Sequence, residues 1–129
     1  MMKVMIVDDD NNMVSLLSIL LEMEGYQVVH ASQQEAILEG MRVERPDVLL
    51  MDIFLPGADG VDVLGRIRSS PELASARVVM TSGMDLSDRC REVGADAFLL
   101  KPYTPEQLLE TLRGALAPGG LAAVPGGPA

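Results

Sequence analysis

The sequence predicts an α/β fold in which five strand–helix units, (βα)5, form a doubly wound, five-stranded parallel sheet between two layers of helices. Two observations predict it. Four short apolar runs, at residues 4–7, 48–51, 78–80 and 98–100, are each followed at once by a polar residue. Runs this short and apolar are typical of strands buried on both faces of a parallel sheet. Segments with helical periodicity alternate with these runs, which favours a sheet covered by helices on both sides.

The first strand, 4–7, leads into a helix predicted over residues 11–24. Apolar residues recur there at helical spacing, and Gly25 follows as a typical C-terminal stop. The apolar positions are Met13, Leu16, Leu17, Leu20 and Leu21. A second strand is expected at 26–30. It contains His30, the only histidine, which we expect to face solvent or to fill packing space away from the crevice at the strand ends.

A capping box marks the start of the second helix, because Ser32 can accept from a free backbone N–H while Glu35 reaches back to the cap. The third strand is predicted at 48–51. The pair Asp59-Gly60 then opens a third helix, which must end before Pro71 because the residue before a proline avoids the helical conformation.

The remaining elements follow the same alternation. A fourth strand at 78–80 precedes a short helix over 85–93, which Gly94 stops, and a fifth strand covers 97–100. The last helix begins at 104–107, a second capping box with proline at the first helical position. Its inward face is predicted to consist of Leu108, Leu109, Leu112 and Leu116.

Length and composition predict one domain, since 129 residues can bury their own core. We expect this domain to span 1–117, because 118–129 contain little besides Pro, Gly and Ala and predict a disordered tail or linker. No apolar run could cross a bilayer, and the acidic residues 8–10 interrupt any signal peptide. The lone Cys90 fits a reducing cytoplasm. A net charge of −9 argues against direct binding of nucleic acid.

Polar side chains follow four of the predicted strands. Asp8 and Asp9 follow the first, Asp52 the third, Thr81 the fourth and Lys101 the fifth. The carboxyl ends of parallel strands meet at one edge of the sheet, and ligands bind in the crevice there. We therefore expect these five side chains to converge on one pocket.

Three neighbouring carboxylates repel one another, so Asp8, Asp9 and Asp52 need either a proton or a cation between them. Ligands that are all oxygen favour Mg²⁺ or Mn²⁺. The alternative is that the acidic turn only caps the first helix, which is sufficient for Asp10. It does not explain Asp52, because no helix follows that residue directly.

Lys101 and Thr81 each have an ordinary structural interpretation beside the functional one. A structural lysine at a strand end would extend to solvent, whereas a lysine across the crevice would supply charge for a phosphoryl group. Thr81 alone would be a β-branched strand residue. The combination of acids, hydroxyl and amine at the strand ends favours the functional interpretation.

Four groups of residues carry a family resemblance: Val7-Asp8-Asp9, Met51-Asp52 with Pro56 and Gly60, Met80-Thr81-Ser82-Gly83, and Lys101-Pro102. With them the chain resembles the receiver domains of two-component response regulators, including the chemotaxis-regulator type, over residues 3–116. Each group alone is weak evidence for the family, but the four together are specific for it. The resemblance implies a flavodoxin-like three-layer sandwich with strand order 2-1-3-4-5.

The resemblance also implies roles for the site residues. Asp52 would be the phosphoacceptor, taking a phosphoryl group from a sensor histidine kinase, a histidine phosphotransfer protein or a small phosphodonor. Asp8, Asp9 and Asp52, with the backbone carbonyl of Phe54, would hold Mg²⁺ or Mn²⁺. Beyond its own phosphorylation and autodephosphorylation, the domain would not be an enzyme.

Thr81 and Lys101 would bind the phosphoryl oxygens, and the Lys101–Pro102 bond is expected to be cis. Thr81 would also act as a switch with Phe98, whose ring rotates inward in the family. The signal would pass to a partner or output domain through helix 85–93, strand 97–100 and the last helix. The same face would be the contact surface of a homodimer.

Two alternatives compete with this hypothesis. Asp8-x-Asp10 after an apolar strand resembles the opening motif of haloacid-dehalogenase-like phosphatases, with Asp8 as nucleophile and Asp10 as general acid. The chain has no room for that family's cap domain and lacks a late acidic pair. The second alternative is an interaction module of receiver shape that is never phosphorylated.

Overall fold

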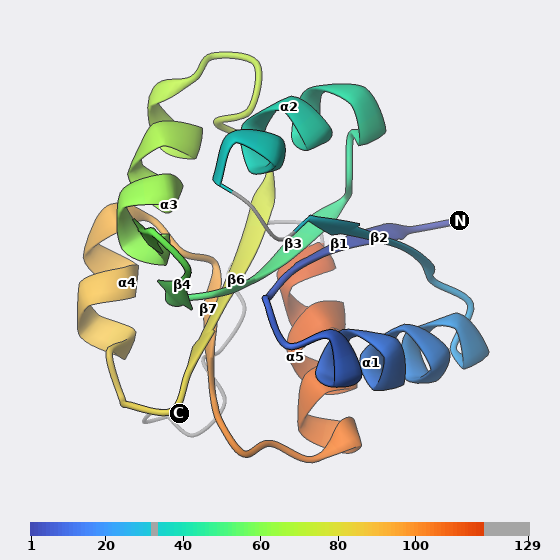
Figure 1. Ribbon diagram of the computed structural model, residues 1–129. Helices are drawn as coiled ribbons and strands as arrows, with labels where there is room; N and C mark the ends of the chain where they lie inside the picture. Colours follow the sequence, from blue (N-terminus) through green and yellow to red (C-terminus); the bar gives the residue numbers. More distant parts are fainter. Residues whose placement is uncertain (32–33, 118–129) are drawn as a thin grey trace.

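The computed structural model describes residues 1–31 and 34–117, and its centre is a five-stranded parallel sheet (Figure 1). The strands of this sheet are β1 (Lys3–Val7), β2 (Gln27–Ala31), β3 (Val48–Asp52), β6 (Arg77–Ser82) and β7 (Ala97–Leu100). They lie in the order β2-β1-β3-β6-β7, with every neighbouring pair parallel. This confirms the predicted order 2-1-3-4-5.

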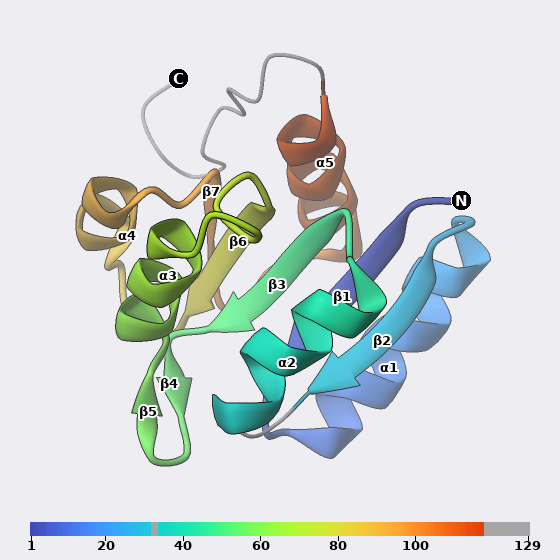
Figure 2. The same ribbon diagram turned by 90° about the horizontal axis from the view of Figure 1, so that it is seen from above.

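Among the described residues, four helices connect successive strands of the sheet, a fifth follows β7, and together they cover both faces. They are α1 (Asn11–Met23), α2 (Gln34–Glu44), α3 (Gly60–Ser69), α4 (Ser87–Val93) and α5 (Pro105–Leu116). Helices α1 and α5 lie on one face, and α2, α3 and α4 lie on the other (Figures 1 and 2). The predicted three-layer sandwich is therefore confirmed.

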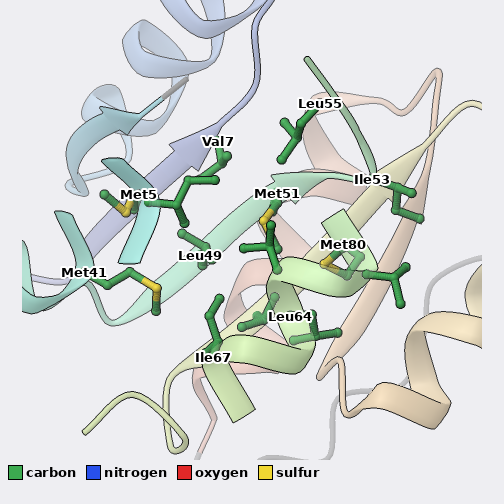
Figure 3. Close-up of a cluster of buried hydrophobic side chains, with 14 of the residues drawn as sticks. Met5, Val7, Met41, Leu49, Met51, Ile53, Leu55, Leu64, Ile67 and Met80 are labelled. Atoms are coloured by element: carbon green, nitrogen blue, oxygen red, sulfur yellow. The ribbon is translucent and has the colours of Figure 1, made fainter. Parts of the chain in front are cut away.

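Each face of the sheet has its own apolar core because successive strand residues point to opposite sides. On the α2–α4 side, Met5, Met51 and Met80 from neighbouring strands pack against α2 and α3 (Figure 3). On the other side, alternate strand residues such as Ile6 and Leu50 pack against α1 and α5. Strand β3 is buried along its whole length, as expected for the centre of a parallel sheet.

Several helix ends are fixed by the residues that the sequence indicated. The side chains of Asp10, Asp59 and Thr104 accept hydrogen bonds from the first turns of α1, α3 and α5. The second capping box is complete at Thr104, with both of its hydrogen bonds to Gln107. Gly94 ends α4 with φ of 103°, a left-handed conformation that costs glycine little. Within the described parts of the chain, no helix is both long and apolar enough to span a bilayer.

Some predicted details differ from the structure or lie outside it. A short hairpin, β4 (Phe54–Leu55) and β5 (Ala58–Asp59), extends beyond β3 and was not predicted (Figure 2). Helix α4 begins later than predicted, because Asp85 accepts hydrogen bonds from the N–H and the hydroxyl of Ser87 in a preceding turn. The first capping box depends on Ser32, which lies outside the described residues, as does the tail 118–129.

Leu16 does not belong to the buried face of α1. The buried residues of that helix are Val14, Leu17 and Leu21, which follow the i, i+3, i+7 spacing of one helical stripe. Leu16 lies outside that stripe and its side chain is 69% exposed. The sequence pattern alone gave α1 a wider apolar face than the sheet covers.

Candidate functional site

The parallel sheet brings together the acids, the hydroxyl and the amine that lie at or just after the ends of its strands. Asp52 and Thr81 are paired neighbours at the ends of β3 and β6. Asp8 follows β1, and Lys101 follows β7 at the far side of the site. The Lys101 Nζ atom lies 3.1 Å from Asp52 Oδ2 and 3.3 Å from Asp8 Oδ2. One ammonium group therefore bridges two carboxylates from different strands.

The third carboxylate completes a compact oxygen cluster. Carboxylate oxygens of Asp8, Asp9 and Asp52 all lie within 4.8 Å of one another. Asp8 and Asp52 are buried, with 4% and 9% of their surface exposed, whereas Asp9 is open to solvent. Three such carboxylates carry more negative charge than the one lysine balances, and their hard oxygen atoms suit a divalent cation such as Mg²⁺. The residues present therefore fit the metal that the sequence predicted.

Backbone groups fix the two buried carboxylates. The N–H of Asp10 donates to Asp8 Oδ1 at 2.9 Å, and the N–H of Phe54 donates to Asp52 Oδ1 at 3.1 Å. Gly60, at the start of α3, packs so closely that a Cβ atom there would lie 2.6 Å from the Asp52 carbonyl oxygen. A glycine is therefore required for α3 to begin directly beside the loop that follows Asp52.

Lys101 is held in its charged form by the acids around it. Burial alone would lower the pKa of its ammonium group, but the hydrogen bonds and charges of Asp52 and Asp8 outweigh burial and raise this pKa above its ordinary value. Tyr103 lies nearby, and burial raises the pKa of its hydroxyl to about 12. The Lys101–Pro102 peptide bond is cis, as expected.

Thr81 has an unusual environment for a hydroxyl. Its side chain is buried, and Oγ1 is the one buried side-chain oxygen or nitrogen atom in the described parts of the chain without a hydrogen-bond partner. A buried polar group without a partner costs free energy, so such a group is a candidate for binding a ligand. Phe98 is also buried, at 3% exposure, in the core under α3 and α4. The ring is thus already inside, and its predicted rotation stays a prediction.

His30 is exposed, as one of its two predicted interpretations expected, but it is not away from the site as predicted. Its Nε2 atom is 2.9 Å from the backbone carbonyl oxygen of Asp8. Strand β2 pairs with β1 so that His30 stands opposite Ile6, two residues before Asp8. The polar end of β2 therefore reaches the turn that carries two of the acids. The sequence carried no signal for this contact, since the acceptor is a backbone carbonyl oxygen.

The sequence matches the family model of the response regulator receiver domain over residues 4–113. Among relatives, it is 33% identical over 108 residues to the alkaline phosphatase synthesis transcriptional regulatory protein PhoP of Bacillus subtilis, covering 82% of this chain and 45% of that protein. It is 34% identical over 115 residues to the transcriptional regulatory protein KdpE of Mycobacterium tuberculosis, covering 88% of this chain and 50% of that protein. The chain spans about half the length of these relatives.

Solved structures agree with the sequence comparison. A putative response regulator from Chloroflexus aurantiacus has a TM-score of 0.83 at 31% identity, covering 89% of this chain and 97% of that one. The chemotaxis response regulator CheY4 of Vibrio cholerae has a TM-score of 0.81 at 28% identity, covering 88% and 97% of the two chains. The similarity in sequence and fold therefore extends over 82–89% of this chain.

Proposed function

Because the chain belongs to the response regulator receiver domain family, we propose that Asp52 accepts a phosphoryl group from a sensor histidine kinase, a histidine phosphotransfer protein or a small phosphodonor. The observation that carries this proposal is the pairing of Asp52 with Lys101 at 3.1 Å, within a cluster of acids whose oxygens lie within 4.8 Å of one another. A carboxylate that lies beside a lysine and in a cluster able to hold a divalent cation is suited to attack phosphorus, because both positive charges neutralise the phosphoryl oxygens.

The chemistry assigns each residue a separate task. An oxygen of Asp52 attacks the phosphorus atom, the bond from phosphorus to the donor breaks, and an acyl phosphate forms on Asp52. Asp8, Asp9 and Asp52, with the Phe54 carbonyl, would hold Mg²⁺ or Mn²⁺, which neutralises phosphoryl charge when bound. Lys101 approaches the same carboxylate from the side of β7 and balances charge on a phosphoryl oxygen.

Thr81 would connect this chemistry to the surface of the domain. Its unpartnered Oγ1 can donate to a phosphoryl oxygen, which gains a hydrogen bond that the unphosphorylated site lacks. Helix α4 follows Thr81 closely, has seven residues, and buries fully only Cys90 among its side chains. An element with few buried contacts shifts at low cost, so α4, β7 and α5 are the proposed surface for a downstream partner, an output domain or a second copy.

The relatives indicate which type of output this domain would control. Their names describe transcriptional and DNA-binding regulators. We expect this domain to control such an output without touching nucleic acid itself, because its net charge of −9 would repel phosphates.

The phosphatase alternative is not favoured. Asp10, its would-be general acid, accepts a hydrogen bond from the N–H of Met13 and caps α1. The family match also favours a receiver over a phosphatase. The unphosphorylated interaction module is not favoured either, since the acids, the lysine and the threonine are all in place.

Labelling with acetyl phosphate and Mg²⁺, followed by intact-protein mass spectrometry, tests the proposal. We expect the unmodified chain to gain one phosphoryl group and Asp52→Asn to gain none. Asp10→Asn is the matched control, because asparagine also caps helices well and Asp10 has no part in the proposed chemistry. Labelling that survives Asp52→Asn and disappears in Asp8→Asn or Asp10→Asn would overturn the proposal in favour of the phosphatase.

A further inference from the structure

We propose that His30 is a positioning residue for the metal site, acting through the peptide group that joins Asp8 to Asp9. The inference rests on the proposed function, since it assumes that these acids hold Mg²⁺. It starts from one contact, the 2.9 Å approach of His30 Nε2 to the Asp8 carbonyl oxygen. His30 itself is exposed at the end of β2, so this contact is not a consequence of burial in the core.

The chemistry of the two atoms fixes the direction of the hydrogen bond. A carbonyl oxygen can only accept, so Nε2 must carry the hydrogen and donate it. The neutral imidazole can carry its proton on Nε2, and the charged ring carries protons on both nitrogens. The hydrogen bond therefore persists in either charge state, and the role that we assign to His30 is geometric.

Asp8 is held at three separate points. Its Oδ1 accepts from the Asp10 N–H at 2.9 Å, its Oδ2 faces Lys101 Nζ at 3.3 Å, and its carbonyl oxygen accepts from His30. The first two contacts orient the carboxylate of Asp8 alone. The third fixes the plane of the peptide that follows, and this plane sets the direction from which the side chain of Asp9 leaves the backbone.

This third contact matters most for Asp9. The Asp9 side chain is exposed, and the turn between the end of β1 and the cap of α1 is short. Groups that hold metal ligands in place commonly contribute about 10- to 100-fold in metal affinity. We expect the lower end of that range, about tenfold, because His30 acts on the backbone and not on a ligand side chain.

Variants at position 30 separate the hydrogen bond from other effects. Histidine Nε2 and the glutamine amide nitrogen are the same number of bonds from Cα, whereas the asparagine nitrogen is one bond closer. His30→Gln should therefore retain the donor at the right place, while His30→Leu and His30→Asn should lose it. Gln27→Leu is the matched control, since Gln27 is also an exposed polar residue and lies at the opposite end of the same strand.

The experiment measures the Mg²⁺ dissociation constant of the full chain at one fixed pH, by isothermal calorimetry or amide chemical shifts. Melting temperatures without metal are measured in parallel. We expect His30→Leu and His30→Asn to bind Mg²⁺ about tenfold more weakly at an unchanged melting temperature. His30→Gln and Gln27→Leu should remain within about twofold of the unmodified chain.

The outcomes separate this inference from the function on which it rests. If the unmodified chain binds no Mg²⁺, the proposed metal site itself is wrong. If it binds Mg²⁺ and all three His30 variants bind equally well, the positioning role is wrong and the metal site stands. If His30→Gln weakens binding as much as His30→Leu and both lower the melting temperature, His30 has only a structural role and the inference is overturned.

Discussion

Lys101 Nζ contacts Asp52 Oδ2 at 3.1 Å, although their strands, β7 and β3, are separated in the sheet by β6. The lysine side chain therefore crosses the end of a whole strand to reach its partner. The contact forms at the carboxyl edge of the sheet, where the ends of the parallel strands and the residues after them come together. The pair makes charge balance at Asp52 depend on a residue 49 positions away.

Replacing Lys101 by methionine should slow phosphorylation without unfolding the domain. Methionine retains most of the aliphatic length but supplies no charge to a phosphoryl oxygen, and removing one such group typically lowers a rate about 100-fold. The measurement is the rate of labelling by acetyl phosphate at saturating Mg²⁺. Lys3→Met is the control. Lys3 also forms an ion pair, with Glu44 at 3.1 Å, but it lies at the start of β1, at the edge of the sheet opposite the site. Equal rates in the two variants would contradict the role of Lys101.

Mg²⁺ should stabilise the folded chain. The three carboxylates come together only in the folded state, so the ion binds that state in preference to the unfolded one. At a free concentration of about 100 times the dissociation constant, the free energy of unfolding should rise by about 2.7 kcal/mol. Urea denaturation with MgCl₂ measures this, against NaCl of equal ionic strength. Asp8→Asn should lose most of the gain, and a gain of equal size in NaCl would show that the ion does not bind at these acids.

The sequence was sufficient to predict the sheet and the convergence of Asp52, Thr81 and Lys101. Buried parallel strands leave few ways to arrange their ends, and the polar residue after each apolar run marks where that end lies. The pattern could not reveal the contact of His30, because a hydrogen bond to a backbone carbonyl leaves no trace in polarity. It depends on how the edge strand is aligned with β1 and on the direction of one ring.

The exposure of Leu16 and the hairpin after β3 were missed for a related reason. Helical periodicity gives the apolar positions of α1 but not the width of the sheet surface that covers them. The hairpin has only two residues in each strand, too few for an alternating pattern to be recognised. Both features are set by packing in three dimensions, which local sequence does not encode.

Stability should fall at alkaline pH because of Tyr103. Burial raises the pKa of its hydroxyl from 10 to about 12, so the folded state keeps a proton that the unfolded state has lost. The stabilisation is complete below pH 10 and is lost as the pH rises toward 12, by roughly 2 to 3 kcal/mol in total. Urea denaturation between pH 9 and about 11.5 measures the slope. The free energy of unfolding of Tyr103→Phe should fall less steeply with pH. In that variant the fall comes from Cys90, whose pKa burial raises to about 11, and from Lys101, whose pKa is also raised in the folded state.

The cap of α5 should contribute measurably to stability. Thr104 Oγ1 accepts from the Gln107 N–H at 3.1 Å, and the Gln107 side chain accepts from the Thr104 N–H at 2.9 Å. Thr104→Ala removes the first bond and should lower the free energy of unfolding by about 1 kcal/mol. Thr104→Ser preserves the hydroxyl and should remain near the unmodified value in the same urea experiment. A loss of equal size in both variants would mean that the methyl group, not the cap, stabilises this end.

The phosphorylated form should lose its phosphoryl group slowly, because the residues beside Asp52 offer little help to an attacking water. Phe54 lies two positions after Asp52, its N–H is bonded to that carboxylate, and its ring is 57% exposed and cannot hydrogen-bond water strongly. Gly83, two positions after Thr81, has no side chain to orient one.

Phe54→Asn should therefore shorten the lifetime of the acyl phosphate. One hydrogen bond that orients the water is worth about 1 kcal/mol, which corresponds to a roughly fivefold faster loss. The protein is phosphorylated with acetyl phosphate, the donor is removed by rapid desalting, and the phosphorylated fraction is followed by mass spectrometry. Phe54→Leu is the control, since leucine also leaves the site without a polar group and should keep the slow rate. If the two variants lose phosphate at the same rate, water access and not its orientation limits hydrolysis, and the assigned role of Phe54 is wrong.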